Sequence, residues 1–135
     1  MGVEYRLVEF NIDTPGNEIW IDLDFVHDAT MNMIRNTQQA QGTKIMNRYR
    51  TRDNYLFTSF KDNGQGMAKE ICKKCFDLGF TTKREGHGIG LSYLSEYLKK
   101  IGGYAVVKSE PGKGAEFILA QPIGTLINPP VEEKK

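Results

Sequence analysis

Two stretches of the sequence have the apolar spacing of helices, and most other segments alternate between apolar and polar residues as β-strands do. The order of these segments is the feature that most restricts the fold. The first stretch runs from residue 23 to about residue 41, and Gly42 follows it as a plausible stop. The second covers residues 89–101 and ends at Gly102 and Gly103. Their apolar faces hold Phe25, Val26, Ala29 and Met33 in the first stretch and Leu91, Leu94, Leu98 and Ile101 in the second.

The remaining segments predict strands grouped in hairpins. Residues 3–12 and 18–22 read as a pair joined by the turn TPGN, residues 43–50 and 54–62 as a second pair, and residues 104–110 and 115–123 as a third around PGKG. Residues 68–77 predict a short helix, and residues 78–88 a glycine-rich loop. We therefore expect an α+β two-layer sandwich, with a mixed, mostly antiparallel sheet covered on one face by about three helices. Its domain should span residues 1–127, before a flexible tail at 128–135.

Charge and hydropathy exclude several classes of function. The 135 residues carry a formal net charge of +1, so the chain lacks the basic footprint of nonspecific nucleic-acid or membrane binding. No apolar run approaches the ~18 residues of a membrane span, and the first residues do not resemble a signal peptide. We expect a cytoplasmic domain, either free or tethered to a membrane receptor through further domains.

The two cysteines, Cys72 and Cys75, form a CKKC motif. Two cysteines cannot build a four-cysteine zinc site. They could be a redox pair, or two half-buried thiols one turn apart on a helix. We favour the second interpretation.

Three short motifs suggest chemistry, although each is weak alone. Asn32 and Asn36 are four residues apart on one helix face, where two amide oxygens could meet Mg²⁺. KDNGQGM places Asp62 at a strand end before two glycines, which allows a flat ligand to approach the backbone. GHGIGL, at residues 86–91, precedes a helix whose N–H groups attract phosphate. The Rossmann, P-loop and eukaryotic kinase signatures are missing.

In this order the motifs resemble the ATP-binding catalytic domain of histidine kinases, in the GHKL ATPase superfamily with its Bergerat fold. The resemblance covers residues 19–122. The matching segments are IWIDLDFVHDATMNMIRNTQQA, KDNGQGM, GFTTKREGHGIGL and GGYAVVKSEPGKGAEFILAQP. It implies the Mg²⁺-ATP-binding domain of a two-component sensor kinase. Such a domain donates the γ-phosphoryl group to a histidine on a separate dimerisation domain, and a response regulator acts downstream.

The resemblance also implies roles for individual residues. Asn36 would bind Mg²⁺ beside Asn32, Asp62 would accept a hydrogen bond from the adenine amino group, and Lys83 would steady the γ-phosphate. Asn32, Asn36 and Lys83 would thus be the catalytic residues. The implied nucleotide-binding set is Asn36, Asp62, Gly64, Gly66, Phe80, Thr81, Thr82, Lys83, Gly86, His87, Gly88, Ile89, Gly90 and Leu91.

Some positions depart from the family pattern. Gln39 replaces a frequent basic residue, and Thr37 replaces the usual alanine. Asn32 stands where ATP-hydrolysing and serine-phosphorylating branches have a glutamate base, and an amide cannot take a proton at neutral pH. His27 precedes Asp28 as in an acceptor box, but it lies within the helix, so we expect a surface histidine.

Two other functions stay open. One is a nucleotide-binding regulatory or anti-sigma-like serine kinase module without histidine phosphotransfer. The other is protein docking through Arg48, Arg50 and Arg52, which share one strand face. Simple solvation of these arginines is the preferred interpretation.

Overall fold

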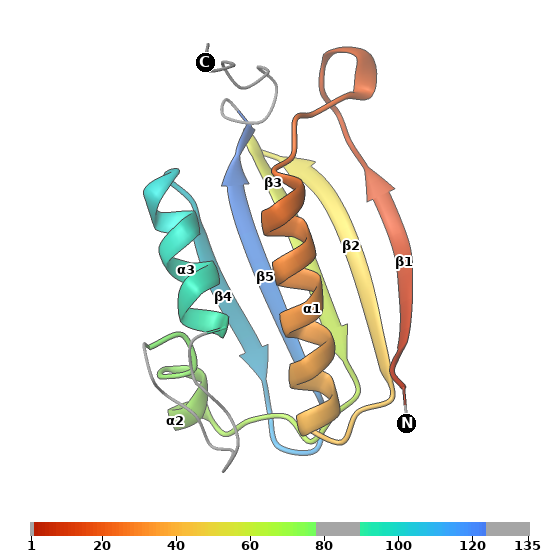
Figure 1. The fold of residues 1–135 in the computed structure, drawn as a ribbon, viewed down its shortest axis with the longest axis vertical. Helices are drawn as coiled ribbons and strands as arrows, with labels where there is room; N and C mark the ends of the chain where they lie inside the picture. Colours follow the sequence, from red (N-terminus) through yellow and green to blue (C-terminus); the bar gives the residue numbers. More distant parts are fainter. Residues whose placement is uncertain (1, 78–89, 124–135) are drawn as a thin grey trace.

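The protein is described by a computed structural model that covers residues 2–77 and 90–123. Its strands form one five-stranded sheet in the order β1-β2-β3-β5-β4, and the helices lie on one face of that sheet (Figure 1). The predicted two-layer α+β fold is confirmed. The strands are β1 (Glu4–Asn11), β2 (Lys44–Arg52), β3 (Tyr55–Asp62), β4 (Tyr104–Ser109) and β5 (Ala115–Pro122). The helices are α1 (Leu23–Gln39), α2 (Lys69–Cys72) and α3 (Gly90–Lys100), and a 3₁₀ turn covers Pro15–Asn17.

The predicted hairpin between residues 3–12 and 18–22 is wrong. Strand β1 instead pairs in parallel with β2, in a register that runs from Glu4 opposite Lys44 to Asn11 opposite Arg50. Parallel neighbours need a crossover connection, and here α1 supplies it. Residues 18–22 form no strand. Their alternating pattern reflects packing, because Ile19 lies against the buried residues Ile12, Tyr49 and Leu56.

Helix α1 begins and ends with local signals. Asp22 is its N-cap, and the Oδ1 atom of Asp22 accepts a hydrogen bond from the Phe25 N–H at 3.2 Å. Phe25, Ala29, Met33 and Thr37 form its buried face, whereas Val26 is only partly buried. The helix ends at Gln39, two residues before the predicted boundary, because Gln41 has a positive φ of 60°.

The two antiparallel pairs predicted at residues 43–62 and 104–123 are confirmed. The β2–β3 connection is the two-residue loop of Asp53 and Asn54, whose φ angles of 52° and 67° are those of a type I′ turn. Strands β4 and β5 pair from Tyr104 opposite Ala120 to Ser109 opposite Ala115. Strand β5 also pairs with β3, so the C-terminal hairpin completes the sheet.

Helix α3 ends at the predicted glycines. The Gly103 N–H donates to the Leu98 carbonyl at 2.7 Å, and Gly102 has a φ of 86°. Leu94 and Leu98 are fully buried in the main core with Phe60, Phe117 and other residues of the sheet's helix-covered face. The α2 helix is shorter than predicted, since residues 73–76 form turns. No helix in the described part of the chain is long and apolar enough to cross a membrane.

Candidate nucleotide site

Helix α1 carries the two predicted asparagines, but their amides have different surroundings. The Nδ2 atom of Asn36 is buried and has no hydrogen-bond partner within residues 2–77 and 90–123. A buried donor without a partner costs about 1–3 kcal/mol, so such a group is uncommon unless a ligand completes it. The Asn32 Nδ2 atom donates to the Asp28 carbonyl of its own helix at 2.9 Å. Of the two, only Asn36 thus has a donor that lacks a partner.

The first residue of α3 contacts α1 at Asn32. A Cβ atom added to Gly90 would lie 1.8 Å from the Asn32 Oδ1 atom, so any larger residue here would have to displace the Asn32 side chain. Leu91, next along α3, packs against the main core. The structure therefore assigns Gly90 a packing role between the helices. Its predicted contact with phosphate remains a prediction.

Asp62 lies at the end of β3, where three donors hold its carboxylate. The Oδ1 atom accepts from the Gly64 N–H at 2.9 Å and from the Ala115 N–H at 3.1 Å. The Oδ2 atom accepts from the Thr37 hydroxyl at 3.3 Å. A carboxylate oxygen can accept more than one hydrogen bond, so Oδ2 can accept another from a ligand amine. The Asp62 side chain is thus held in one orientation before any ligand binds.

Thr37 is a site residue whose role was missed from sequence alone. It follows Asn36 on α1, and only 1% of its surface is exposed. The signal was its departure from the alanine usual in the family. The hydroxyl of this threonine links α1 directly to Asp62, so the two predicted halves of the site meet at Thr37.

Replacing Thr37 with valine should lower the free energy of unfolding by about 1 kcal/mol, because the Asp62 carboxylate loses one neutral donor while the side-chain shape is kept. Thr37→Ser is the matched control, since it retains the hydroxyl. Urea unfolding of both variants measures the effect. A serine variant that loses as much unfolding free energy as the valine variant would contradict the role given to the hydroxyl.

The glycines after Asp62 pack against protein. A Cβ atom on Gly64 would lie 2.8 Å from the Ala40 Cβ atom, and one on Gly66 would lie 2.0 Å from the Glu110 carbonyl oxygen. The loop that holds Gly64 and Gly66 therefore packs between the end of α1 and the β4–β5 hairpin. Sequence reasoning expected these glycines to make room for the base. The structure adds a contact with the hairpin, in which Gly114 also takes part.

The other predicted ligand-binding residues are not all described. Eight of them lie outside residues 2–77 and 90–123, namely Phe80, Thr81, Thr82, Lys83, Gly86, His87, Gly88 and Ile89. Gln39 is exposed at the last position of α1, and His27 is exposed on the same helix, as expected for a surface histidine.

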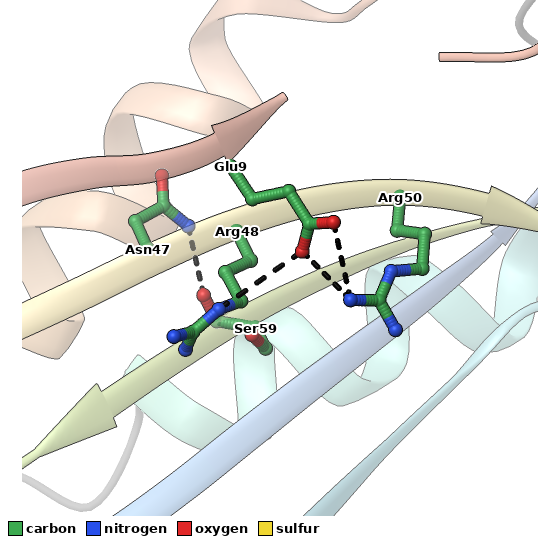
Figure 2. A network of polar contacts seen from close by, with 5 residues as sticks. All are labelled: Glu9, Asn47, Arg48, Arg50 and Ser59. Carbon is green, nitrogen blue, oxygen red and sulfur yellow. Dashed lines mark hydrogen bonds and ion pairs between the residues drawn. The ribbon is translucent and has the colours of Figure 1, made fainter. Parts of the chain in front are cut away.

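Arg48, Arg50 and Arg52 lie on the sheet face opposite the helices, as their spacing predicts. Figure 2 shows Glu9 of β1 between Arg48 and Arg50. The Arg50 Nη2 atom is 2.8 Å from the Glu9 Oε1 atom, and the Arg48 Nε atom is 4.0 Å from it. Arg52 pairs with Asp53 at 3.5 Å. These carboxylates offset part of the arginine charge, which supports solvation over docking.

A cavity of about 780 Å³ lies next to the predicted site without coinciding with it. It opens between α2 and the β4–β5 hairpin. Two of its lining residues, Gly114 and Ala115, adjoin Asp62. Asn32, Asn36 and Gly90 do not line it. The described residues also contain no group of three or more His, Cys, Asp or Glu side chains that could hold a metal by themselves.

Comparison with known families identifies the class of protein. Residues 14–125 match the family of histidine kinase-, DNA gyrase B- and HSP90-like ATPases, and the chain belongs to it. Among curated relatives, the signal transduction histidine-protein kinase AtoS of Escherichia coli is 34% identical over 127 residues, 90% of this chain. The sensor histidine kinase ZraS of Salmonella typhi is 29% identical over 119 residues, 86% of this chain.

Solved structures share the fold. The catalytic domain of the histidine kinase ThkA has a TM-score of 0.70 at 23% identity, with 90% of this chain and 79% of that chain covered. Full-length ShkA in complex with AMPPNP has a TM-score of 0.75 at 24% identity, with 90% of this chain and 26% of that chain covered. The chain spans 21% of AtoS and 26% of ZraS, so it corresponds to one part of these relatives.

Proposed function

We propose that this chain is the Mg²⁺-ATP-binding catalytic domain of a two-component sensor histidine kinase. In this role it donates the γ-phosphoryl group to a histidine on a separate dimerisation domain, and a response regulator receives the signal. The proposed location is cytoplasmic. Family membership and the similarity to sensor kinases such as AtoS support the proposal.

One observation of geometry carries the proposal. The Asp62 carboxylate is held by Gly64, Ala115 and Thr37. Asn36, next to Thr37 in the sequence, has a buried Nδ2 atom without a partner among the described residues. A fixed carboxylate suits the amino group of adenine, because that group is a hydrogen-bond donor. The neighbouring amide suits the phosphate end of the same ligand. The Asp62 carboxylate accepts hydrogen bonds and suits the base, whereas the Asn36 amide can donate and suits the phosphates.

The residues present also fit Mg²⁺. The amide oxygen of Asn36 is a hard ligand, and Mg²⁺ in nucleotide sites usually takes one or two protein ligands plus water and substrate phosphates. When bound, Mg²⁺ neutralises charge on the phosphates. Asn36 would hold it, while its buried Nδ2 atom would donate to a phosphate or water oxygen. Asn32, at the position of a base in hydrolytic relatives, cannot accept a proton.

The Asn36→Ala variant tests the proposal. We expect affinity for an ATP analogue in the presence of Mg²⁺ to fall about 10- to 100-fold, since a contact with charged groups is lost. The enhancement of binding by Mg²⁺ should disappear. The free energy of unfolding should stay within about 1 kcal/mol, because the truncation also removes a buried donor that no described residue satisfies.

Calorimetric titration with and without Mg²⁺ measures these effects. Gln38→Ala is the matched control, because Gln38 is exposed on the same helix. The proposal is wrong if Mg²⁺ enhances binding equally in the native chain and in Asn36→Ala. It is also wrong if the folded native chain binds no nucleotide at millimolar concentration.

A regulatory module that binds nucleotide without phosphotransfer is the second candidate, and the exposed Gln39 is the observation that favours it. A supplied acceptor domain separates the two functions. Acid-labile phosphohistidine on that domain supports the kinase, whereas none under saturating Mg²⁺-ATP supports the regulatory module. We expect this chain alone not to phosphorylate itself, and acid-labile phosphohistidine on it would contradict that expectation.

A further inference from the structure

The nucleotide site leaves the CKKC motif unused. The sequence favoured two half-buried thiols over a redox pair, and the structure buries Cys75 but leaves Cys72 half-buried, so the two thiols differ. Cys72 is the last residue of α2, and Cys75 lies in the turn that follows. The Cys75 thiol donates to the Cys72 carbonyl, with Sγ and O 3.5 Å apart. Residues three apart in such a turn have Cα atoms closer than about 7 Å. Disulfides span Cα separations of roughly 4.4–6.8 Å, so this spacing permits a bond between the two sulfurs.

The two thiols differ in access. Cys75 is 6% exposed and belongs to the main core, and burial raises the pKa of its thiol to about 12. Cys72 is half-buried and lines the 780 Å³ cavity beside the β4–β5 hairpin. An external reagent can therefore reach Cys72, whereas Cys75 remains a protonated, enclosed thiol. The charge of a Cys72 thiolate also raises the pKa of Cys75, and that contribution ends once Cys72 is in a disulfide.

The cavity around Cys72 is basic. Four lysines line it, from β3, α2, β4 and the hairpin turn, against two glutamates. Lys113 pairs with Glu110 at 3.2 Å. The other three form no ion pair with any residue that the structure describes; they are Lys61, Lys69 and Lys108. Lys69 lies three residues before Cys72 on α2, one helical turn away. Such a surface attracts anions to the accessible thiol.

We propose that Cys72 and Cys75 form a redox-active dithiol that an anionic low-molecular-weight disulfide, of the glutathione class, oxidises through this cavity. The Cys72 thiolate attacks one sulfur of the reagent, a Cys72 mixed disulfide forms, and one thiolate leaves. Cys75 then gives its proton to the released thiolate and its sulfur attacks the Cys72 sulfur. The bond between Cys72 and the reagent breaks, the intramolecular disulfide forms, and the second thiolate leaves. The protons of both protein thiols end on the two released thiols. The protein loses two electrons, and the reagent gains them.

Mass spectrometry of the reduced native chain, after addition of glutathione disulfide, tests the order of events. We expect the native chain to end as an intramolecular Cys72–Cys75 disulfide. Cys75→Ala should stop at a glutathione adduct on Cys72, and Cys72→Ala should stay unmodified while folded. Cys75→Ser repeats the test if alanine disturbs the core. Thermal unfolding and peptide mapping of the native chain accompany the variants.

Three results would overturn the proposal. They are modification of Cys75 in folded Cys72→Ala at the native rate, a native chain that remains a dithiol, and a native chain that keeps the mixed adduct without closing the disulfide. None of these readouts involves nucleotide, so the dithiol proposal and the kinase proposal are tested independently. Either one can be wrong while the other is right.

A charge reversal tests the role of the lysines. Lys69→Glu should lower the rate of oxidation by anionic glutathione disulfide more than the rate of oxidation by cationic cystamine. We expect the two rate changes to differ by a factor of about five. Lys100→Glu is the matched control, because Lys100 is exposed at the far end of α3 and does not line the cavity. The electrostatic guidance is refuted if Lys69→Glu changes the oxidation rates for the two reagents by the same factor.

Discussion

Replacing Asp62 with asparagine is expected to weaken binding of adenine nucleotides about 10- to 100-fold and to leave the fold intact. The single amide oxygen of asparagine can still accept from the Gly64 and Ala115 N–H groups, which bind Oδ1 in the native chain. The amide nitrogen then replaces Oδ2 beside the Thr37 hydroxyl, which can rotate and accept. The adenine amino group would instead meet a second donor. The lost charge-assisted hydrogen bond accounts for about 1.5–3 kcal/mol.

The same substitution should also change base selectivity. Guanine has an oxygen where adenine has its amino group, so the new amide nitrogen could donate to it. Calorimetric titrations of the native chain and Asp62→Asn with AMP-PNP and GMP-PNP, plus thermal unfolding, measure both effects. An equal loss of affinity for the two nucleotides in a folded variant would contradict direct recognition of the base by Asp62.

Gly114→Ala should cause a large loss of stability. A Cβ atom at Gly114 would lie 2.1 Å from the Asp62 carbonyl oxygen and 3.0 Å from its carbon, and backbone atoms cannot move aside as a flexible side chain can. The φ angle of 72° adds about 1–2 kcal/mol of strain for a residue with a side chain. Together with overpacking of about 1–3 kcal/mol, we expect a loss of about 3–4 kcal/mol.

Gly112→Ala separates the two causes. Gly112 lies in the same hairpin turn with a φ angle of 80°, but no heavy atom lies within 4 Å of the added Cβ. It should lose only the strain energy, about 1–2 kcal/mol. Chemical unfolding of both variants measures the difference. Equal destabilisation would show that contact with the Asp62 backbone is unimportant.

The sequence alone predicted most of the fold, because apolar spacing records which face of each element becomes buried. Helix α1 and its buried Phe25, Ala29 and Met33, the β2–β3 and β4–β5 pairs, and the glycine stop of α3 are all as expected. The strand predicted at residues 18–22 was wrong for a related reason. A partly buried Ile19 produces the same alternation whether the chain pairs with a strand or only packs against one.

Part of the candidate site was also visible in the sequence. Asn32, Asn36 and Asp62 could be named from their motifs. The parallel partner of β1 could not, because residues distant in sequence supply its hydrogen bonds. For the same reason Glu9 could not be assigned to Arg48 and Arg50.

The sequence by itself determined the two longer helices, the antiparallel strand pairs and the chemical types of most candidate site residues, since these depend on local spacing and backbone preference. Only the tertiary structure decided which of those residues meet. It placed the Thr37 hydroxyl on Asp62, Gly90 against Asn32, and Gly114 against the Asp62 backbone. Each contact joins segments far apart in the chain, and close packing of the two layers determines which atoms touch.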